Sequence, residues 1–364
     1  MGRQELGWLV ASEFSEHAHP ARSWSNGRLS DHADRILAQG TIVAEVKLRN
    51  GIVRPSRLVS YESTEGWFRR FILFLNPDGS VSVEHRQGGT RAYVRVSSIG
   101  IMARRIRITY SWSGPARNGL LTVEDVDNGT IRQALQNAPL PMQIRDARAI
   151  ASGRASCRID PAVLAVSVSN AIQRIGPGPA IAAGTKVKTA TGFKPVERIR
   201  PGDLVATQSG ALAPVRWIVS DPLPGVGFNA PIRLRAPYYG LQSSITVAST
   251  HMVQAAGTET EHLVGRNNSL IEAGYLIGHP GAERDREGWV IPYFQLLLDR
   301  HACINLAGIW AESLFIGNLR RAEELVVSTH FAEFGAAELP FHRQPVCVPL
   351  ADYEKLSVLD ALTA

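Results

Sequence analysis

The stretch GPGPAIAAGTKVKTATGFKPVERIRPGDLV, residues 176–205, decides how the second half of this chain folds. It opens on two Gly-Pro pairs, which interrupt regular structure and indicate an exposed break between domains. Strand-like alternation follows around Val187, and turn residues follow at Gly192 and Gly202. Short strands with this punctuation predict a compact β domain that begins at Ala180.

The bulk composition favours two β-rich domains. The chain has 364 residues, 45% of them hydrophobic, which is enough to build two separate cores. With 32 Gly and 21 Pro and few long helical periodicities, many turns are expected. No apolar run approaches the roughly 20 residues of a membrane helix, so no membrane span is expected. The start, MGRQELGWLVASEFSEHAHP, lacks the pattern of a conventional signal peptide, so localisation stays open, including export by another route.

Charge and cysteine content add little about partners. Residues 1–179 carry 23 Lys and Arg against 15 Asp and Glu, a net of +8, and residues 180–364 carry 16 against 18, a net of −2. The basic residues are scattered arginines, so a solvated surface is favoured over a nucleic-acid partner. Cys157, Cys303 and Cys347 form no close pair, which favours buried thiols over metal ligation. No cofactor or metal is expected, and the oligomeric state is left open.

The first half is predicted to be a β-sandwich. Residues 41–50, 105–114 and 118–130 alternate apolar and polar side chains and then stop at a Gly or an Asn-Gly pair. Within residues 66–87, two strand-like runs flank Asn76-Pro77-Asp78-Gly79, a hairpin signal because Pro fixes φ and Gly accepts a positive φ. Strands at this spacing with no helix between them indicate two packed antiparallel sheets.

The segment after this sandwich is harder to interpret. Residues 1–150 are assigned to the sandwich, and residues 151–179 to a transitional segment that ends in the Gly-Pro linker. A short helix and a last strand are expected after residue 131. The run DPAVLAVSVSNAIQRIG, from Asp160, has an Asp-Pro start and then helical spacing.

Residues 40–150 resemble the concanavalin-like and laminin-G-like jelly rolls, on the order of strand, Asn-Pro-Asp-Gly turn, strand and RITYSW. The resemblance implies binding of a glycan or a protein surface. Trp67, Tyr93, Tyr110 and Trp112 are candidates for stacking on sugar, although aromatics on strands usually belong to the core.

From Ala180 onward the chain resembles the Hint family, shared by hedgehog autoprocessing domains and inteins, and in particular its bacterial branch. Five pieces carry the resemblance in the right order over about residues 180–350 and imply a Hint domain at 180–364. They are GTKVKTATGFKPVERIRPGDLVAT (184–207), APVRWI (213–218), ITVASTHMV (245–253), PYFQLLLDRHACINLAGIWAESL (292–314) and RQPVCVPLADYEKL (343–356). The fold expected for the whole chain is therefore all-β, an N-terminal sandwich followed by a Hint-type β fold.

The Hint resemblance implies self-cleavage at the bond between Pro179 and Ala180. In this family a Cys, Ser or Thr attacks the preceding carbonyl and turns the amide into a thioester or ester. A His protonates the departing nitrogen, and donors stabilise the oxyanion. His251 matches the central His of the family. Asp299 and His301 match its late motif, and Thr185 of the Gly-Thr pair is counted with the site.

Three positions depart from the family pattern. Ala180 stands at the nucleophile position and has no lone pair to attack with. Ala248, three residues before His251, replaces the usual Ser or Thr, and Gln295 stands where a His or Asp is usual. The C-terminus also lacks the His-Asn end that splicing needs. The chain as written is therefore expected not to cleave itself. At most, the resemblance implies a single-turnover autoprocessing protein.

Two explanations for Ala180 stay open. One is a substitution introduced to keep a self-cleaving precursor intact, and the other is a naturally degenerate Hint domain. An alternative function from a different class also stays open, in which the chain is a non-catalytic binding or structural protein and the sandwich recognises a glycan or a protein surface.

Overall fold

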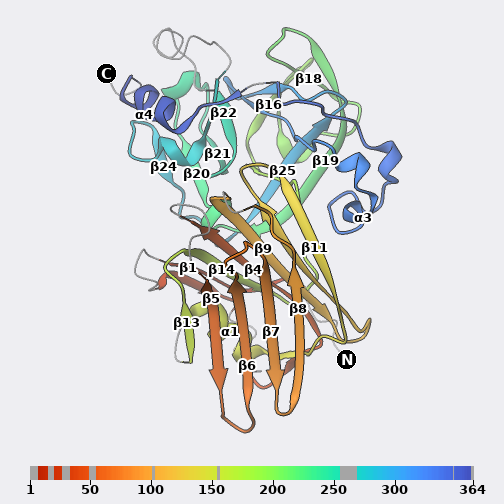
Figure 1. The fold of residues 1–364 in the computed structure, drawn as a ribbon. Coiled ribbons are helices and arrows are strands. Elements are labelled where there is room, and N and C mark those ends of the chain that lie inside the picture. Colours follow the sequence, from red (N-terminus) through yellow and green to blue (C-terminus); the bar gives the residue numbers. More distant parts are fainter. Residues whose placement is uncertain are drawn as a thin grey trace. The chain divides into compact units, whose positions relative to one another are not determined.

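The computed structural model describes residues 7–14, 20–26, 33–48, 55–100, 103–153, 156–254, 269–346 and 348–361. The chain divides into two compact units, Met1–Gly176 and Pro177–Ala364. Both are built mainly from strands (Figure 1), which confirms the all-β fold class.

Seven of the described strands of the first unit form one antiparallel sheet, in the order β11-β10-β9-β4-β14-β1-β2. They are β1 (Trp8–Phe14), β2 (Pro20–Ser25), β4 (Gln39–Lys47), β9 (Arg105–Ser113), β10 (Asn118–Asp125), β11 (Thr130–Asn137) and β14 (Val163–Ser169).

A five-stranded sheet in the order β13-β5-β6-β7-β8 forms the second layer of this unit (Figure 1). Its strands are β5 (Ser56–Ser63), β6 (Arg69–Leu75), β7 (Val81–Gln87), β8 (Thr90–Val96) and β13 (Cys157–Ile159). The predicted hairpin joins β6 to β7, and Gly79 adopts the positive φ of 80° that its turn requires. The unit also contains a short pair, β3 (Ile36–Leu37) with β12 (Met142–Gln143), and the helix α1 (Ile144–Ser152).

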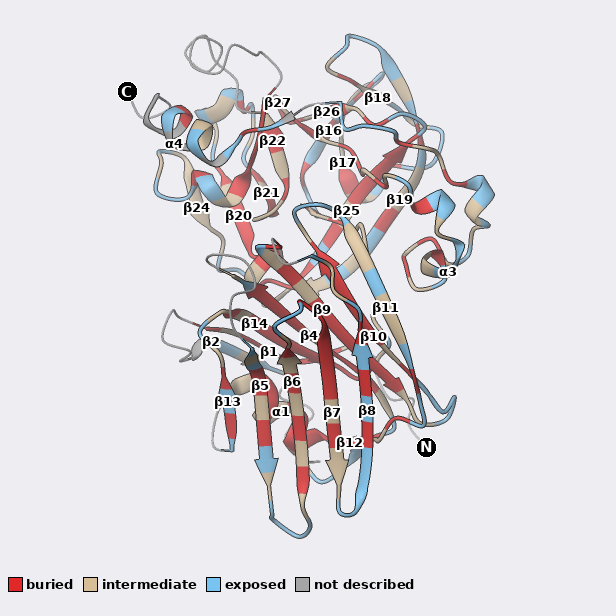
Figure 2. Cartoon of the chain, viewed as in Figure 1, coloured by how far each residue is buried: buried red, intermediate tan, exposed pale blue. Residues whose placement is uncertain are grey.

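The core of the first unit is formed by the facing sides of the two sheets and by α1. Along β6, buried residues alternate with partly buried ones, as the two-residue period of a strand dictates (Figure 2). Ile144, Ala147 and Ile150 of α1 join the same cluster of buried side chains. Cys157 is a free, buried thiol in this core, and Cys303 is buried in the second unit. Cys347 lies outside the described residues.

The structure differs from the prediction for the segment after residue 150. The helical spacing inferred from Asp160 onward is wrong, because Val163–Ser169 is strand β14, paired with β1 and β4 inside the seven-stranded sheet. Six of its seven residues are buried, so both faces of the strand are covered and the alternation that identifies a strand is lost. Residues 157–169 thus belong to the sandwich rather than to a transitional segment.

The second unit is built on one curled sheet that the described strands form in the order β24-β20-β21-β15-β25-β19-β18-β16-β26-β27-β22-β23-β28, with β17 paired to β16. Its strands are β15 (Ile181–Ala182), β16 (Lys186–Thr189), β17 (Gly192–Pro195), β18 (Leu204–Ala206), β19 (Leu212–Pro224), β20 (Pro231–Leu234), β21 (Ile245–Ala248), β22 (Met252–Gln254), β23 (Ser269–Glu272), β24 (Ala282–Arg284), β25 (Val290–Leu298), β26 (Cys303–Leu306), β27 (Ile309–Glu312) and β28 (Val348–Pro349).

Short helical turns connect these strands. They are the 3₁₀ turns η2 (Val196–Arg198), η3 (Gly227–Asn229), η4 (Tyr238–Gly240), η5 (Ala273–Leu276), η6 (Leu319–Arg321) and η7 (Ala336–Glu338), and the α-helices α3 (Glu323–Val326) and α4 (Asp352–Ala361). Aliphatic side chains from most of the strands pack into one cluster, including Ile181, Val187 and Leu296. The start of the predicted β domain is therefore part of its core.

Candidate functional site

The peptide before Ala180 enters the second unit as part of its sheet. The Ala180 N–H donates to the carbonyl of Phe294 at 3.2 Å, and the Ala180 carbonyl accepts the N–H of Ala248 at 2.7 Å. The next residue, Ile181, pairs with β21 on one side and with β25 on the other. The Pro179–Ala180 bond is thus held between two strands by hydrogen bonds on the Ala180 side.

The side chain of Ala180 packs into a small apolar cluster. Its neighbours there include Ala248 and Tyr293, which are buried, while Ala180 itself is half-buried. Pro179 is buried. A methyl group at this position fills space but supplies no atom that can attack a carbonyl, so the arrangement positions a peptide bond without a nucleophile.

His251 lies at the end of a tight turn that starts at Ala248. The His251 N–H donates to the Ala248 carbonyl at 2.9 Å, and the His251 carbonyl accepts the N–H of Ala273 at 2.9 Å. The turn therefore links His251 to the residue that holds the Ala180 carbonyl. Burial lowers the pKa of His251 to about 4, so the imidazole is neutral near pH 7.

The two hydroxyls inside this turn are engaged elsewhere. Ser249 Oγ donates to the carbonyl of Phe228 at 3.0 Å, and Thr250 Oγ1 donates to the same carbonyl at 3.2 Å. They fasten the turn to η3 and leave Ala248 without a substitute for the hydroxyl that the family pattern has at 248. Sequence reasoning missed this role, because nothing along the chain links residues 249–250 to 228.

Gln295 is brought into the same region by β25. It follows Phe294, whose carbonyl holds the Ala180 N–H, and its Nε2 donates to the Glu312 carbonyl at 3.0 Å. The pairing of Val253 with Ala311 brings the start of β22, next to His251, toward the same end of β27. The Nε2 atom of His251 and the Oε1 atom of Gln295 are buried with no hydrogen-bond partner among the described residues.

Comparison with known proteins agrees with this geometry. The family model described as "Hint domain" matches residues 179–318, from the buried proline before Ala180 to a point beyond β27. The second unit contains a Hint domain. No curated protein matches the chain.

Three solved structures illustrate what the two units are similar to. A bacterial intein-like domain from Clostridium thermocellum is 14% identical, and the match covers 37% of this chain and 99% of that one, with a TM-score of 0.28. The CBM40 domain of a Ruminococcus gnavus IT-sialidase is 15% identical over 46% of this chain and 91% of that one, with a TM-score of 0.29. The LG1-3 region of the laminin alpha2 chain is 13% identical over 85% and 56%, with a TM-score of 0.27.

Thr185 lies inside the Hint domain as a structural tie. Its side chain is buried and its Oγ1 donates to the Thr246 carbonyl at 3.3 Å, while its own carbonyl accepts the N–H of Val196. It therefore joins β21 to the turn that follows β17. Its hydroxyl is engaged with the backbone of β21.

Asp299 and His301 of the late Hint motif have separate surroundings. Asp299 is exposed and forms a long ion pair with Arg216, with 3.7 Å between the charged atoms. His301 is buried against Phe315 and His342, with its ring centroid 5.1 Å from that of Phe315.

The aromatic residues proposed for sugar binding divide into buried and exposed groups. Tyr110 and Trp112 are 1% and 0% exposed and stack on each other in the sandwich core, so the expectation that they contact a ligand is corrected. The Trp112 indole N–H donates to the Leu37 carbonyl there. Trp67 and Tyr93 are about half exposed, at 45% and 47%.

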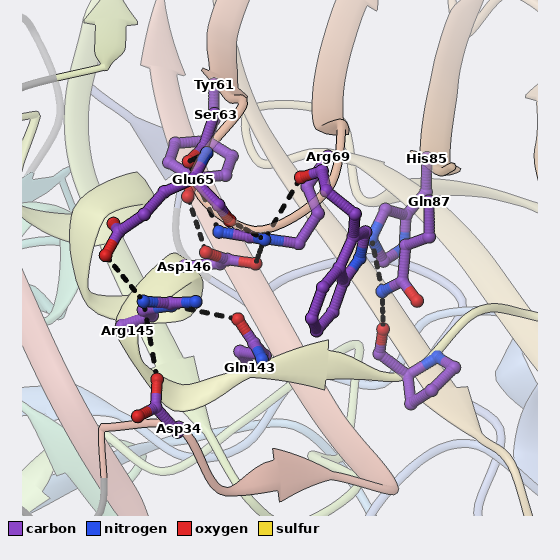
Figure 3. Close-up of polar contacts among 12 residues, drawn as sticks. Asp34, Tyr61, Ser63, Glu65, Arg69, His85, Gln87, Gln143, Arg145 and Asp146 are labelled. Atoms are coloured by element: carbon purple, nitrogen blue, oxygen red, sulfur yellow. Dashed lines mark hydrogen bonds and ion pairs between the residues drawn. The ribbon is translucent and has the colours of Figure 1, made fainter. Parts of the chain in front are cut away.

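The Trp67 ring is in contact with a buried arginine. The Arg69 guanidinium lies 4.9 Å from the Trp67 ring centroid and forms an ion pair with Asp146 at 2.8 Å. It also donates to the carbonyl of Glu65 at 2.7 Å and to Ser63 Oγ at 3.2 Å. Figure 3 shows this guanidinium between the strand that carries Ser63 and the helix that carries Asp146. The loop that presents Trp67 is therefore fixed at several points.

No helix in the described ranges has both the length and the apolar character to cross a bilayer. Within the same ranges, no group of three or more His, Cys, Asp or Glu side chains is arranged to hold a metal ion.

Proposed function

We propose that the Hint domain of this chain keeps the frame for an acyl shift at the Pro179–Ala180 bond but does not carry the shift out. By the frame we mean the strands and the turn that position this bond. The observation that supports this most is the double anchoring of Ala180. Its N–H and its carbonyl are both held by neighbouring strands, next to the turn that carries a buried neutral histidine. The frame is present, and the reacting atom is missing.

The chemistry that such a frame supports needs a thiol or hydroxyl at residue 180. Its sulfur or oxygen would bond to the Pro179 carbonyl carbon, the C–N bond would break, and the amide nitrogen would gain a proton. A neutral His251 suits this step, because it can take the proton from the attacking group and return it to the departing nitrogen. No external acid is needed, and atoms and charge balance.

Two further positions weaken the frame. Ala248 offers no hydroxyl, and the hydroxyls of Ser249 and Thr250 are engaged with Phe228. Gln295 cannot take up or give a proton at neutral pH, unlike the His or Asp of the family pattern. We infer that the site lacks its nucleophile, one donor and one titratable group.

The test is to restore the nucleophile alone. We expect Ala180→Cys to yield a fragment that ends at Pro179 when hydroxylamine is added, because hydroxylamine attacks a thioester and leaves a hydroxamate. Intact-mass spectrometry of the full chain measures it.

Ala183→Cys is the matched control, because it places a thiol three residues away from residue 180, the position that directly follows the scissile bond. An Ala180→Cys chain that stays whole for days in hydroxylamine would show that positions 248 and 295 have also disabled the site. Equal cleavage of both variants would refute a positioned reaction.

A second proposal concerns the first unit, which we propose binds glycans through Trp67. The support is the half-exposed ring, fixed by a cation–π contact to an arginine that is itself buried and hydrogen-bonded. A ring held in place loses little conformational entropy when a sugar stacks on it.

We expect Trp67→Ala to weaken binding to immobilised oligosaccharides by about 2- to 12-fold, the range that aromatic stacking of about 0.5–1.5 kcal/mol implies. Tyr238→Ala is the control, since Tyr238 is about equally exposed but lies in the second unit. Binding that both variants weaken equally, or that neither weakens, would count against a site at Trp67.

A further inference from the structure

The C-terminal strap, residues 341–350, crosses the Hint domain after the residues that the family model matches. Its strand β28 pairs in parallel with β23 and so covers the edge of the curled sheet. The Leu350 N–H donates to the Leu270 carbonyl at 2.9 Å, and both side chains are buried. The strap therefore protects a sheet edge and part of the core.

Two buried histidines fasten this strap. His342, on the strap, donates from Nε2 to the Leu298 carbonyl at 3.0 Å and accepts the Ile316 N–H at Nδ1 at 3.4 Å. His301, on the body of the domain, accepts the Val346 N–H of the strap at Nδ1 at 3.1 Å. Its Nε2 lies 3.2 Å from the Ser313 carbonyl.

These contacts fix the protonation state of both rings. Each Nδ1 faces a backbone N–H, which can only donate, so each Nδ1 must present a lone pair. Each Nε2 faces a carbonyl and must carry the hydrogen. Both histidines are therefore neutral in the closed arrangement. A second proton on either Nδ1 would place two donors against each other and break the contact with Val346 or with Ile316.

The rings also lie in one aromatic group. The Phe315 ring is 5.1 Å from the His301 ring and 5.9 Å from the His342 ring, and the two imidazole centroids are 6.0 Å apart. Two positive charges at that distance in a buried group repel each other. Protonation of one ring therefore disfavours the closed arrangement and the protonation of the other.

Few charges are placed to stabilise an imidazolium here. The carboxylate of Glu312 lies 3.9 Å from His301 Nε2 and would form an ion pair with that ring once it is protonated, yet burial still lowers the pKa of His301. Asp299, near His342, is exposed and paired with Arg216. On the strap itself, the Arg343 guanidinium lies near the Phe341 ring and adds a positive charge.

The pKa values agree with this geometry. Burial, with a smaller effect from His342, lowers the pKa of His301 to about 4. Burial also lowers the pKa of His342, against the opposing effects of the Leu298 carbonyl and of Asp299.

We propose that His301 and His342 form an acid-operated clasp that holds the C-terminal strap closed when neutral and releases it from the β23 edge when protonated. Opening would uncover the unpaired backbone of β23 and the apolar side chains of Leu270 and Leu350.

The direction with pH follows from the lowered pKa. His301 binds protons less readily when the strap is closed than when it is open. It therefore stabilises the closed strap in full at pH values above the ordinary histidine pKa of about 6.5, and this stabilisation is lost as the pH falls from there toward 4. For His301 alone, these two values imply that the opening equilibrium rises by about 30-fold between pH 7.5 and pH 5. His342 adds to this in the same direction.

Hydrogen exchange of the full chain tests the clasp, with rates corrected for the pH dependence of free amides. We expect the peptide with Val346 and Leu350 to lose protection by about 30-fold or more between pH 7.5 and pH 5. A peptide from β25 should lose far less over the same range. Parallel loss in both peptides would mean global unfolding and would overturn the proposal.

Variants separate the clasp from other buried histidines. The double variant His301→Gln and His342→Gln should remove the pH dependence of strap exchange. His85→Gln, a matched control because His85 is also buried with a pKa of about 4 but lies in the sandwich, should retain it. A double variant with the wild-type pH dependence would overturn the proposal. If the double variant does not fold, the histidine ¹⁵N spectrum of the wild-type chain gives the test. Titration of His301 and His342 at a pH different from that of strap opening would equally overturn the proposal.

Discussion

The triple variant Ala180→Cys, Ala248→Thr and Gln295→His is expected to cleave at the Pro179–Ala180 bond about 100-fold faster or more than Ala180→Cys alone. A hydroxyl at 248 would supply a donor to the tetrahedral oxyanion, and loss of one such donor costs about 10²–10³-fold in rate. An imidazole at 295 would add general acid–base help, worth about 10²–10⁴-fold. Part of the gain is lost to imperfect fit, because Gln295 also holds the Glu312 carbonyl.

The measurement is the first-order rate of fragment release, followed by intact mass without hydroxylamine and then with it. His251→Ala in the triple background is the matched control, and it should return the rate to that of the uncatalysed shift. A triple variant no faster than Ala180→Cys would show that the missing groups at 248 and 295 do not face the reacting bond. A rate that His251→Ala leaves unchanged would remove His251 from the mechanism.

Asp146→Ala is expected to destabilise the first unit by about 3–5 kcal/mol, the usual cost of removing one partner of a buried ion pair. Arg69 is 1% exposed, and Asp146 is the carboxylate it pairs with (Figure 3). Without that carboxylate, the guanidinium keeps its charge in the interior, and the Tyr61 hydroxyl loses its acceptor. Since domains are stable by only about 5–15 kcal/mol, the loss is a large part of the total.

Urea unfolding followed by tryptophan fluorescence measures this loss as a shift of the midpoint at constant slope. Glu62→Ala is the matched control, because Glu62 pairs with Arg70 at the surface, and an exposed pair contributes about 0–1 kcal/mol. Equal shifts for the two variants would mean that the Arg69–Asp146 pair contributes no more than a surface pair.

Local patterns predicted several of the strands. The alternation in residues 41–50 and 105–114 corresponds to β4 and β9, and the Asn-Pro-Asp-Gly turn joins β6 to β7. Each of these signals depends on neighbouring residues alone. β14 was misread because a strand buried on both faces has no alternation to detect.

The candidate site was predictable only in part. The family motifs pointed to Ala180, His251 and Gln295, and the structure brings their backbones into one region through β21, β25 and β27. Whether an aromatic residue on a strand is buried depends on the facing sheet, so Tyr110 and Trp112 could not be separated from Trp67 in advance. The hold of His301 on Val346 depends on a chain reversal 45 residues later, which no local pattern encodes.

The insertion of β15 between β21 and β25 has a practical consequence for dividing this protein. The two longer strands are not neighbours in the described sheet, and Ile181–Ala182 supplies the hydrogen bonds to both. A recombinant fragment that starts at Gly184 would lack β15. This would leave an empty lane, the strand position between β21 and β25, with two unpaired strand edges, although the fragment contains every later motif of the family. A fragment that starts at Pro177 keeps this lane filled. The same lane offers a place where a short synthetic peptide with the sequence of residues 177–183 can be added back to a truncated domain.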